Sequence, residues 1–398
     1  MLVRYKNDSK GNSIPFAKIY TKDEHKINPS FIDRDAFRAV KKLQSTGAEA
    51  YIVGGAVRDL LLNKKPKDFD ITTSASPRQI HKLFWNSRII GKRFKLVHLE
   101  YGNKILEVST FRSDEESFGI NNNVFGTVEQ DAKRRDFSIN AFYYNPINEQ
   151  VLDFNNSMED FKKRKISSII DLKNSFSEDP VRMLRAIKYS ISTDFKLKFN
   201  VKRAIKHNQS ELAKVSTSRL TEEVNKILSS GYSRDIFIKL QKYKLLVYLL
   251  PCFNIYASLD RVQNSLLELD YKVRQYQNGE TEEVQRNTML LHLVKELIIF
   301  SEEGLTQRER FKETFRQIKI LISPMTPSNY EVELCCAQLL KMKGFSVPKG
   351  CVRRPKTSNN INFERRRKYI SSKKRSNKKY DNSKRKKKTT QAKITPST

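Results

Sequence analysis

Two aspartates separated by one residue are the part of this sequence with the clearest chemical meaning. They occur in the segment Lys67-Asp68-Phe69-Asp70. Residues two apart in a β-strand point to the same face, so the two carboxylates would project together while Phe69 enters the core. Adjacent carboxylates repel each other unless a cation lies between them, and Mg²⁺ prefers carboxylate oxygens together with substrate phosphates. The pair therefore predicts a site for two magnesium ions that serves phosphoryl or nucleotidyl transfer, with a solvent-facing pair at a sheet edge as the alternative.

A third acidic residue, Glu107, stands in the apolar run Ile105-Leu106-Glu107-Val108. A lone carboxylate in such a strand costs free energy unless it has a partner or a function. Glu107 is therefore our candidate for the third acidic group of the metal site. A surface residue in a salt bridge is the alternative.

A pair of glycines precedes the aspartates, in Val53-Gly54-Gly55, and Arg58-Asp59 follows three residues later. Glycines let a phosphate approach the backbone closely, and the start of a helix offers free N–H groups to an anion. The spacing is neither that of a dinucleotide fingerprint nor that of a Walker loop. On its own, the pair is equally well explained as an ordinary tight turn.

Alternating element types position these residues in the N-terminal part of the chain. We expect a helix over 33–44, strands over 50–53 and 68–72, helices over 56–62 and 76–84, and a hairpin of strands 94–101 and 104–111 around Gly102-Asn103. Beyond about residue 155, helical periodicity dominates, for instance over 180–191, 219–228 and 234–243. The predicted fold class is α+β, with a small mixed or antiparallel sheet followed by helices.

Five separated motifs, in order, resemble the polymerase-beta superfamily, in its class II branch of tRNA CCA-adding enzymes and bacterial poly(A) polymerases. The resemblance covers about residues 25–251. The motifs are Gly54-Gly55-x-x-Arg58-Asp59, Asp68-x-Asp70, Glu107, Arg134-Arg135-Asp136-Phe137-x-x-Asn140 and Glu178-Asp179-x-x-Arg182.

This resemblance implies a palm domain that precedes all-α neck and body domains, and a reaction with ATP. It implies that Asp68 and Asp70 hold two Mg²⁺ ions and that Glu107 completes the catalytic triad. It also implies a set of nucleotide-binding residues, which are Gly54, Gly55, Arg58, Arg134, Arg135, Asp136, Asn140, Asp179, Arg182 and Arg185. Arginine offers paired donors to phosphate, and Asn140 offers a partner for a sugar hydroxyl. Asp179 and Arg182, three apart on an expected helix, would be neighbours on one face and would read a base edge.

The choice between poly(A) and CCA addition depends on the sequence between these motifs. Residues 89–98, which contain Gly91-Lys92-Arg93-Phe94, resemble the signature of bacterial poly(A) polymerases, and residues 123–131 also resemble that branch. The segment 114–123 is shorter and more acidic than is usual there. We expect AMP addition to RNA 3′ ends, as in mRNA polyadenylation, with CCA addition to tRNA as the alternative and a non-catalytic RNA-binding protein as the second alternative.

The charge of the chain favours a polyanionic partner, for which RNA is the expectation. The net charge is +32, and residues 351–398 contribute 18 basic residues against 2 acidic ones, which is half of that excess. This last segment has almost no apolar residues, and we expect a disordered basic tail that attracts phosphate without reading sequence. A solubilising extension is the alternative.

The expected domains are 1–46 (N-terminal extension and helix), 47–155 (catalytic palm), 156–232 (neck, binding nucleotide and RNA), 233–350 (helical body) and 351–398 (tail). The four cysteines lack metal-ligand or disulfide spacing, so we expect ordinary thiols. The sequence shows neither a membrane span nor the apolar core of a signal peptide, from which we expect a cytoplasmic protein.

Overall fold

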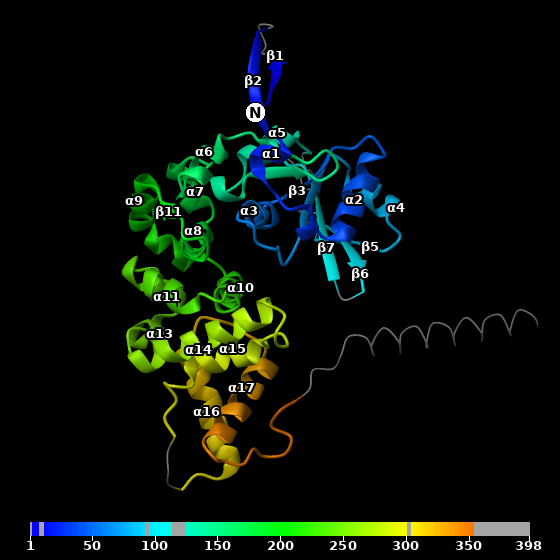
Figure 1. Cartoon of the computed structure of the whole chain (residues 1–398). Helices are drawn as coiled ribbons and strands as arrows, with labels where there is room; N and C mark the ends of the chain where they lie inside the picture. The colour runs from blue at the N-terminus through cyan, green and yellow to red at the C-terminus, as the bar shows by residue number, and fades with distance from the viewer. Residues whose placement is uncertain are drawn as a thin grey trace, which may run out of the picture.

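The computed structural model describes residues 2–7, 12–91, 96–102, 104–113, 125–300 and 304–353. A β-sheet with its covering helices forms one region, and a long run of helices extends from it (Figure 1). The expected class, a mixed sheet followed by helices, is confirmed. The domain boundaries given above remain a prediction.

The sheet of the described residues has nine strands in the order β1-β2-β9-β8-β3-β4-β7-β6-β5. It is therefore larger than the small sheet that we expected. Only β4 and β7 run parallel among the neighbouring strands described in it. The strands are β1 (Leu2–Asn7), β2 (Ser13–Tyr20), β3 (Ala50–Val53), β4 (Asp70–Thr73), β5 (Ser87–Ile90), β6 (Leu96–Tyr101), β7 (Lys104–Thr110), β8 (Phe142–Asn145) and β9 (Gln150–Asp153).

Helices that follow local sequence signals cover one face of this sheet. The side chain of Asp33 accepts hydrogen bonds from two backbone amides and starts α2 (Arg34–Gln44). Ser76 forms a capping box with Gln79, and Pro77 is the first residue of α4 (Pro77–Leu83). Between them lies α3 (Gly55–Leu61). These helices bury residues such as Val40 in a shared core with the sheet, whereas α5 (Val128–Lys133) packs on the opposite face.

The remaining helices form the second region, which descends from α6 beside the sheet to α16 and α17 at the far end (Figure 1). Its core is one continuous apolar cluster that also includes Phe137 and Ile139 from the segment after α5. Two short strands, β10 (Lys165–Ile166) and β11 (Lys196–Leu197), pair in parallel at its beginning.

The helices of this region are α6 (Ser157–Lys162), α7 (Leu172–Glu178), α8 (Val181–Ser192), α9 (Phe199–His207), α10 (Thr217–Leu228), α11 (Ser233–Lys242), α12 (Leu246–Leu249), α13 (Pro251–Tyr256), α14 (Asp260–Gln277), α15 (Arg286–Val294), α16 (Gln307–Leu321) and α17 (Asn329–Met342). A four-residue helix, α1 (Lys22–His25), precedes α2. Within the described ranges, no helix combines the length and the apolar character that crossing a membrane requires.

Two expectations were inaccurate at this level. The hairpin β1–β2 was expected as an extension, yet β2 pairs with β9 and widens the sheet. Strand β4 begins at Asp70, so Asp68 lies in the loop before it. The tail from residue 354 onward lies outside the described residues, as do residues 92–95 and 114–124.

Candidate active site

Two of the predicted catalytic carboxylates lie side by side on the central strands. Asp70 begins β4, and Glu107 lies in the middle of β7, directly opposite Asp70 in the parallel ladder. Leu106 and Val108 are buried beneath the helix-covered face, so Glu107 points to the other face, where its side chain is 52% exposed. The strand order therefore brings together two residues that are far apart in the sequence.

Asp68 joins this pair from the loop before β4. It is exposed, Phe69 is buried and Asp70 is exposed, so the expected alternation of the two aspartates about Phe69 is present although the strand starts later. Desolvation raises the pKa of Asp70 to about 6, and the negative charges of Glu107 and Asp68 add to the shift, while Arg135 opposes it. The three carboxylates are thus close enough to repel one another.

The residues at this edge fit a hard divalent cation. Carboxylate oxygens are the donors that Mg²⁺ prefers, and a bound cation would relieve the repulsion that raises the pKa of Asp70. In the part of the chain that the structure describes, no three His, Cys, Asp or Glu side chains stand together as a ready-made metal site. Asp68 and Asp70 are the residues that would hold the ion.

His98 is an additional neighbour of Glu107. It lies opposite Glu107 in the antiparallel ladder of β6 and β7, with its Nε2 3.5 Å from the Glu107 Oε1 atom. No motif in the sequence singles it out. The expected hairpin around Gly102-Asn103 contained the necessary signal, because a turn at that place sets the register that pairs His98 with Glu107.

The glycine turn lies beside the carboxylates. Gly54 has φ +69° and ψ −134°, a conformation that residues with a side chain strongly disfavour. A β-carbon at Gly54 would lie 3.7 Å from the Asp70 Oδ2 atom and 3.9 Å from the Arg135 Nη1 atom. The turn backbone, a carboxylate and a guanidinium therefore surround one small space.

Arg135 is held in place by two groups that the sequence analysis missed. Its Nη2 lies 3.0 Å from the Asp131 Oδ2 atom, and its Nε donates to the Tyr143 hydroxyl at 3.2 Å. That hydroxyl donates to the same Asp131 oxygen at 2.6 Å. Burial alone would lower the pKa of Arg135, but Tyr143 and Asp131 raise it above its ordinary value. The guanidinium is a fixed positive charge next to Asp70.

The neighbouring residues of the same motif face in other directions. Arg134 ends α5 and donates to the Ser113 carbonyl oxygen at 2.9 Å. Asp136 is buried, and its Oδ2 atom lies 2.8 Å from the Arg185 Nη2 atom on α8. Asp136 and Arg185 therefore connect the sheet region to the first long helix of the helical region.

A second cluster joins two of the motifs and Arg185 around Tyr189, a residue that no local sequence pattern indicated. Arg58 binds both carboxylate oxygens of Asp59, donates to the Asn140 Oδ1 atom at 3.0 Å and lies over the Tyr189 ring at 5.3 Å. Arg185 donates to the Tyr189 hydroxyl at 3.3 and 3.2 Å. Asn140, which was expected to meet a sugar, is buried, and its amide oxygen accepts from Arg58.

The expectation that Asp179 and Arg182 lie three residues apart on one helix was wrong. Pro180 disfavours helical backbone in the residue before it, so α7 ends at Glu178 and Asp179 is extended, with φ −141°. The Asp179 carboxylate accepts from Arg219 at 2.9 and 3.0 Å. Arg182 instead donates to the Ser175 carbonyl oxygen at 2.9 Å.

Comparison with known proteins agrees with this arrangement. The model of the Poly A polymerase head domain matches residues 50–167, and a model described as "Probable RNA and SrmB- binding site of polymerase A" matches residues 194–256. Poly(A) polymerase I of Haemophilus influenzae is 40% identical over 244 residues, which are 58% of this chain and 54% of the relative. A CCA-adding enzyme of Lactobacillus helveticus is 37% identical over 206 residues, which are 51% of each chain. The chain thus spans about half the length of the curated relatives that it matches.

Solved structures share the fold. A tRNA nucleotidyltransferase complexed with a primer tRNA and an incoming ATP analog superposes with a TM-score of 0.53 at 23% identity, covering 88% of this chain and 99% of that one. A CCA-adding enzyme with ATP gives 0.51 at 20% identity, covering 82% and 85%.

The fold is shared with solved tRNA nucleotidyltransferases, and Asp70 and Glu107 lie opposite each other on its central strands. The chain is thus similar to bacterial poly(A) polymerases and to CCA-adding enzymes, and residues 50–167 match the Poly A polymerase head domain.

Proposed function

We propose that the protein is a template-independent nucleotidyltransferase that adds AMP from ATP to the 3′ ends of RNA. The observation that carries the proposal is the opposed pair Asp70 and Glu107, with Asp68 beside it and the Arg135 guanidinium next to Asp70. Carboxylates that gather in this way beside a fixed cation suit the transfer of a negatively charged nucleotide. The likeness to bacterial poly(A) polymerases supports the choice of AMP.

In the proposed reaction, the RNA 3′-oxygen attacks the α-phosphorus of ATP, a phosphodiester bond forms and pyrophosphate leaves. Two Mg²⁺ ions held by Asp68 and Asp70 would supply charge neutralisation at the attacking and leaving oxygens. Glu107 would accept the proton of the 3′-hydroxyl group. Its exposed side chain on the open face of β7 leaves it accessible to such a substrate.

Other residues of the chain would bind and orient ATP. Arg135, fixed by Asp131 and Tyr143, is in place to donate to the triphosphate, and Gly54 leaves room for it beside the turn. We propose that Gly55 lines the same space and that Arg134 supports it through its contact with the Ser113 carbonyl oxygen. We propose that Arg58, Asp136, Asn140 and Arg185 position the nucleotide-binding residues through their mutual contacts.

We further propose that Asp179 and Arg182 face the base, at the start of α8. Arg219 orients the Asp179 carboxylate there, and Arg182 extends from the first turn of the helix. A carboxylate acceptor and a guanidinium donor together complement the edge of a base.

RNA is the proposed polymer partner. The net charge of +32, and the concentration of half of it in residues 351–398, favour attraction to phosphate without sequence preference. Because RNA and ATP are both abundant in the cytoplasm, we propose that location.

CCA addition to tRNA is a second candidate, which the likeness to CCA-adding enzymes favours. Purified protein given an unstructured RNA and ATP should produce long A tails, and CTP should not be required. If it extends only a tRNA that lacks its CCA end, and stops after C-C-A with ATP and CTP, the proposal of poly(A) addition is wrong.

A further inference from the structure

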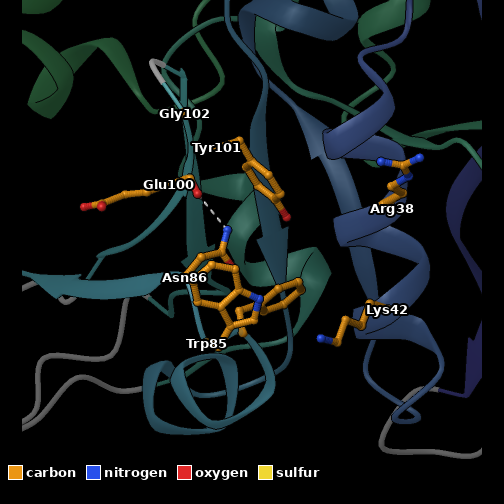
Figure 2. A pocket seen from close by; sticks show the side chains of 8 residues that line it. Arg38, Lys42, Trp85, Asn86, Glu100, Tyr101 and Gly102 are labelled. Atoms are coloured by element: carbon orange, nitrogen blue, oxygen red, sulfur yellow. Dashed lines mark hydrogen bonds between the residues drawn. The ribbon is translucent and has the colours of Figure 1, made fainter.

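A groove outside the candidate active site lies between α2 and the end of β6 (Figure 2). Its volume is about 380 Å³, which is within the range of pockets that bind small organic groups. Its lining includes Arg38 and Lys42 from α2, Phe84, Trp85 and Asn86 after α4, and Tyr101 at the end of β6.

The most unusual residue of the groove is Trp85. It is the only tryptophan of the chain, and it is 93% exposed. Tryptophan is normally well buried because its ring is large and apolar, so an indole held in water needs another reason to be there. Phe84 is buried beside it, and the Asn86 Nδ2 atom donates to the Glu100 carbonyl oxygen at 2.8 Å. The segment that carries the exposed ring is therefore anchored on both sides.

The wall opposite the ring is positively charged. Helix α2 carries four basic residues, Arg34, Arg38, Lys41 and Lys42, and one acidic residue, Asp35. The Arg38 side chain is 74% exposed, and its Nη1 lies only loosely, at 3.7 Å, from the Asp35 Oδ1 atom. The Lys42 ammonium lies 4.9 Å from the centre of the Phe84 ring. Figure 2 shows the Glu100 side chain pointing away from these cations.

The groove is on the opposite face of the sheet from the carboxylates. Val97 and Leu99 of β6 are buried beneath the α2-covered face, so His98 points to the other face, where it meets Glu107. Tyr101 packs against the α2-covered core and lines the groove. A nucleotide that is held at Asp70 therefore cannot reach Trp85.

We propose that this groove is a second RNA-binding site, in which an unpaired base stacks on Trp85 while Arg38 and Lys42 bind the adjoining phosphates. An exposed aromatic face beside flexible cations is how single-stranded nucleic acid is bound without sequence preference. A cationic ligand does not fit, because the basic wall repels it. The inference rests on the proposed function, in which RNA is the substrate, and it adds a contact for the strand away from its reacting 3′ end.

Because Trp85 is the only tryptophan, its fluorescence reports directly on the groove. An oligoadenylate of about 12 nucleotides, a length in the range that single-strand sites cover, should quench it saturably in the full chain. The variant in which both Arg38→Ala and Lys42→Ala are made should bind the oligonucleotide at least several-fold more weakly by the same signal. ATP with Mg²⁺ should leave the fluorescence unchanged. Polyglutamate, a polyanion without bases, should also leave it unchanged. Absent quenching by RNA, equal quenching by ATP or polyglutamate, or unaltered affinity in the double variant would overturn the proposal.

A second measurement separates this proposal from the proposed activity. Trp85→Ala should raise the KM for long RNA roughly ten-fold, the usual effect of losing one stacked base, and leave kcat at saturating RNA unchanged. Trp85→Phe should largely restore KM, whereas the exposed control Tyr271→Ala on α14 should behave as wild type. Asp70→Asn should still show quenching of Trp85. An active enzyme without quenching would refute the groove alone, and quenching without any incorporation by the wild type would refute the activity alone.

Discussion

Asp70 and Glu107 face each other across β4 and β7, the parallel pair of the described sheet, although a helix and two strands separate them in the sequence. A shift of one residue in this register would turn one of the two carboxylates into the apolar core. The site is therefore as well defined as the register of the central strands, and those strands are fixed by the buried residues around them, such as Ile71 and Val108.

Replacing Gly54 should lower the turnover of the enzyme by more than the loss of stability explains. Gly54→Ala forces a side chain into a left-handed conformation, which costs about 1–3 kcal/mol of unfolding free energy. A methyl group there would make ordinary van der Waals contact with Asp70 and Arg135. It would also occupy the space that we propose for the triphosphate, and misplacing a reacting group by about 1 Å lowers turnover by roughly a hundred-fold. Urea unfolding and AMP incorporation measure the two effects.

Gly47→Ala is the matched control for this experiment. Gly47 also has a left-handed φ, +83°, but a β-carbon there meets nothing within 4 Å. This variant should lose stability and retain its turnover per folded molecule. Equal losses of turnover in both variants would mean that the conformation of Gly54 matters and that its closeness to Asp70 does not.

The contact between Asp136 and Arg185 should stabilise the docking of the sheet region on α8. Removing one partner leaves a buried carboxylate without its counter-charge, so a double-mutant cycle of Asp136→Asn and Arg185→Ala should give a coupling of about 1–3 kcal/mol. The exposed pair Arg164 and Asp194 is the control, with side chains 58% and 94% exposed, and its cycle should give at most about 0.5 kcal/mol. A coupling of at most about 0.5 kcal/mol for Asp136 and Arg185 would show that their contact does not stabilise this docking.

His292 should make the helical region sensitive to mild acid. Its Nε2 accepts from the Lys272 ammonium, so Nδ1 carries the proton that is donated to the Ser265 carbonyl oxygen at 2.9 Å. Burial, together with Lys272 and Lys295, lowers the pKa of His292 to about 4. The unfolded chain binds the proton more readily, so the stabilisation is present above pH 6.5 and is lost as the pH falls toward 4.

Between pH 7.5 and 5, this one group should remove about 2 kcal/mol of unfolding free energy. The substitution His292→Asn keeps a donor near the Nδ1 position but does not titrate. Urea unfolding at the two pH values should therefore show a smaller pH dependence in the variant. The same dependence in both proteins would show that other groups cause the acid sensitivity.

The sequence predicted those parts of the structure that local rules determine. The expected helices over 33–44 and 76–84 form, with Asp33 and Ser76 as their caps, and Tyr101 pairs with Lys104 in the expected hairpin. Both follow from side-chain hydrogen bonds and backbone freedom within a few residues. The order of the five motifs predicted the proteins to which the chain is similar for the same reason, because each motif is read locally.

Contacts between segments that are distant in the sequence could not be predicted in the same way. Tyr189 unites Arg58 and Arg185 through a packing arrangement that no local pattern indicates. The spacing of Asp179 and Arg182 suits one helix, but Pro180 disfavours helical backbone in the residue before it and leaves Asp179 outside the helix. The attachment of β2 to β9 depends on a strand that ends more than 100 residues later.

The central claim, nucleotidyl transfer at the Asp70 edge, is tested most directly by Mg²⁺-dependent incorporation of labelled AMP into an RNA 3′ end. Asp70→Asn keeps the size of the side chain and removes its charge, and it should reduce incorporation at least about a thousand-fold, equivalent to about 4 kcal/mol. RNA affinity should stay unchanged, and the exposed control Asp194→Asn should be fully active. Incorporation by Asp70→Asn within about ten-fold of the wild type would contradict the account.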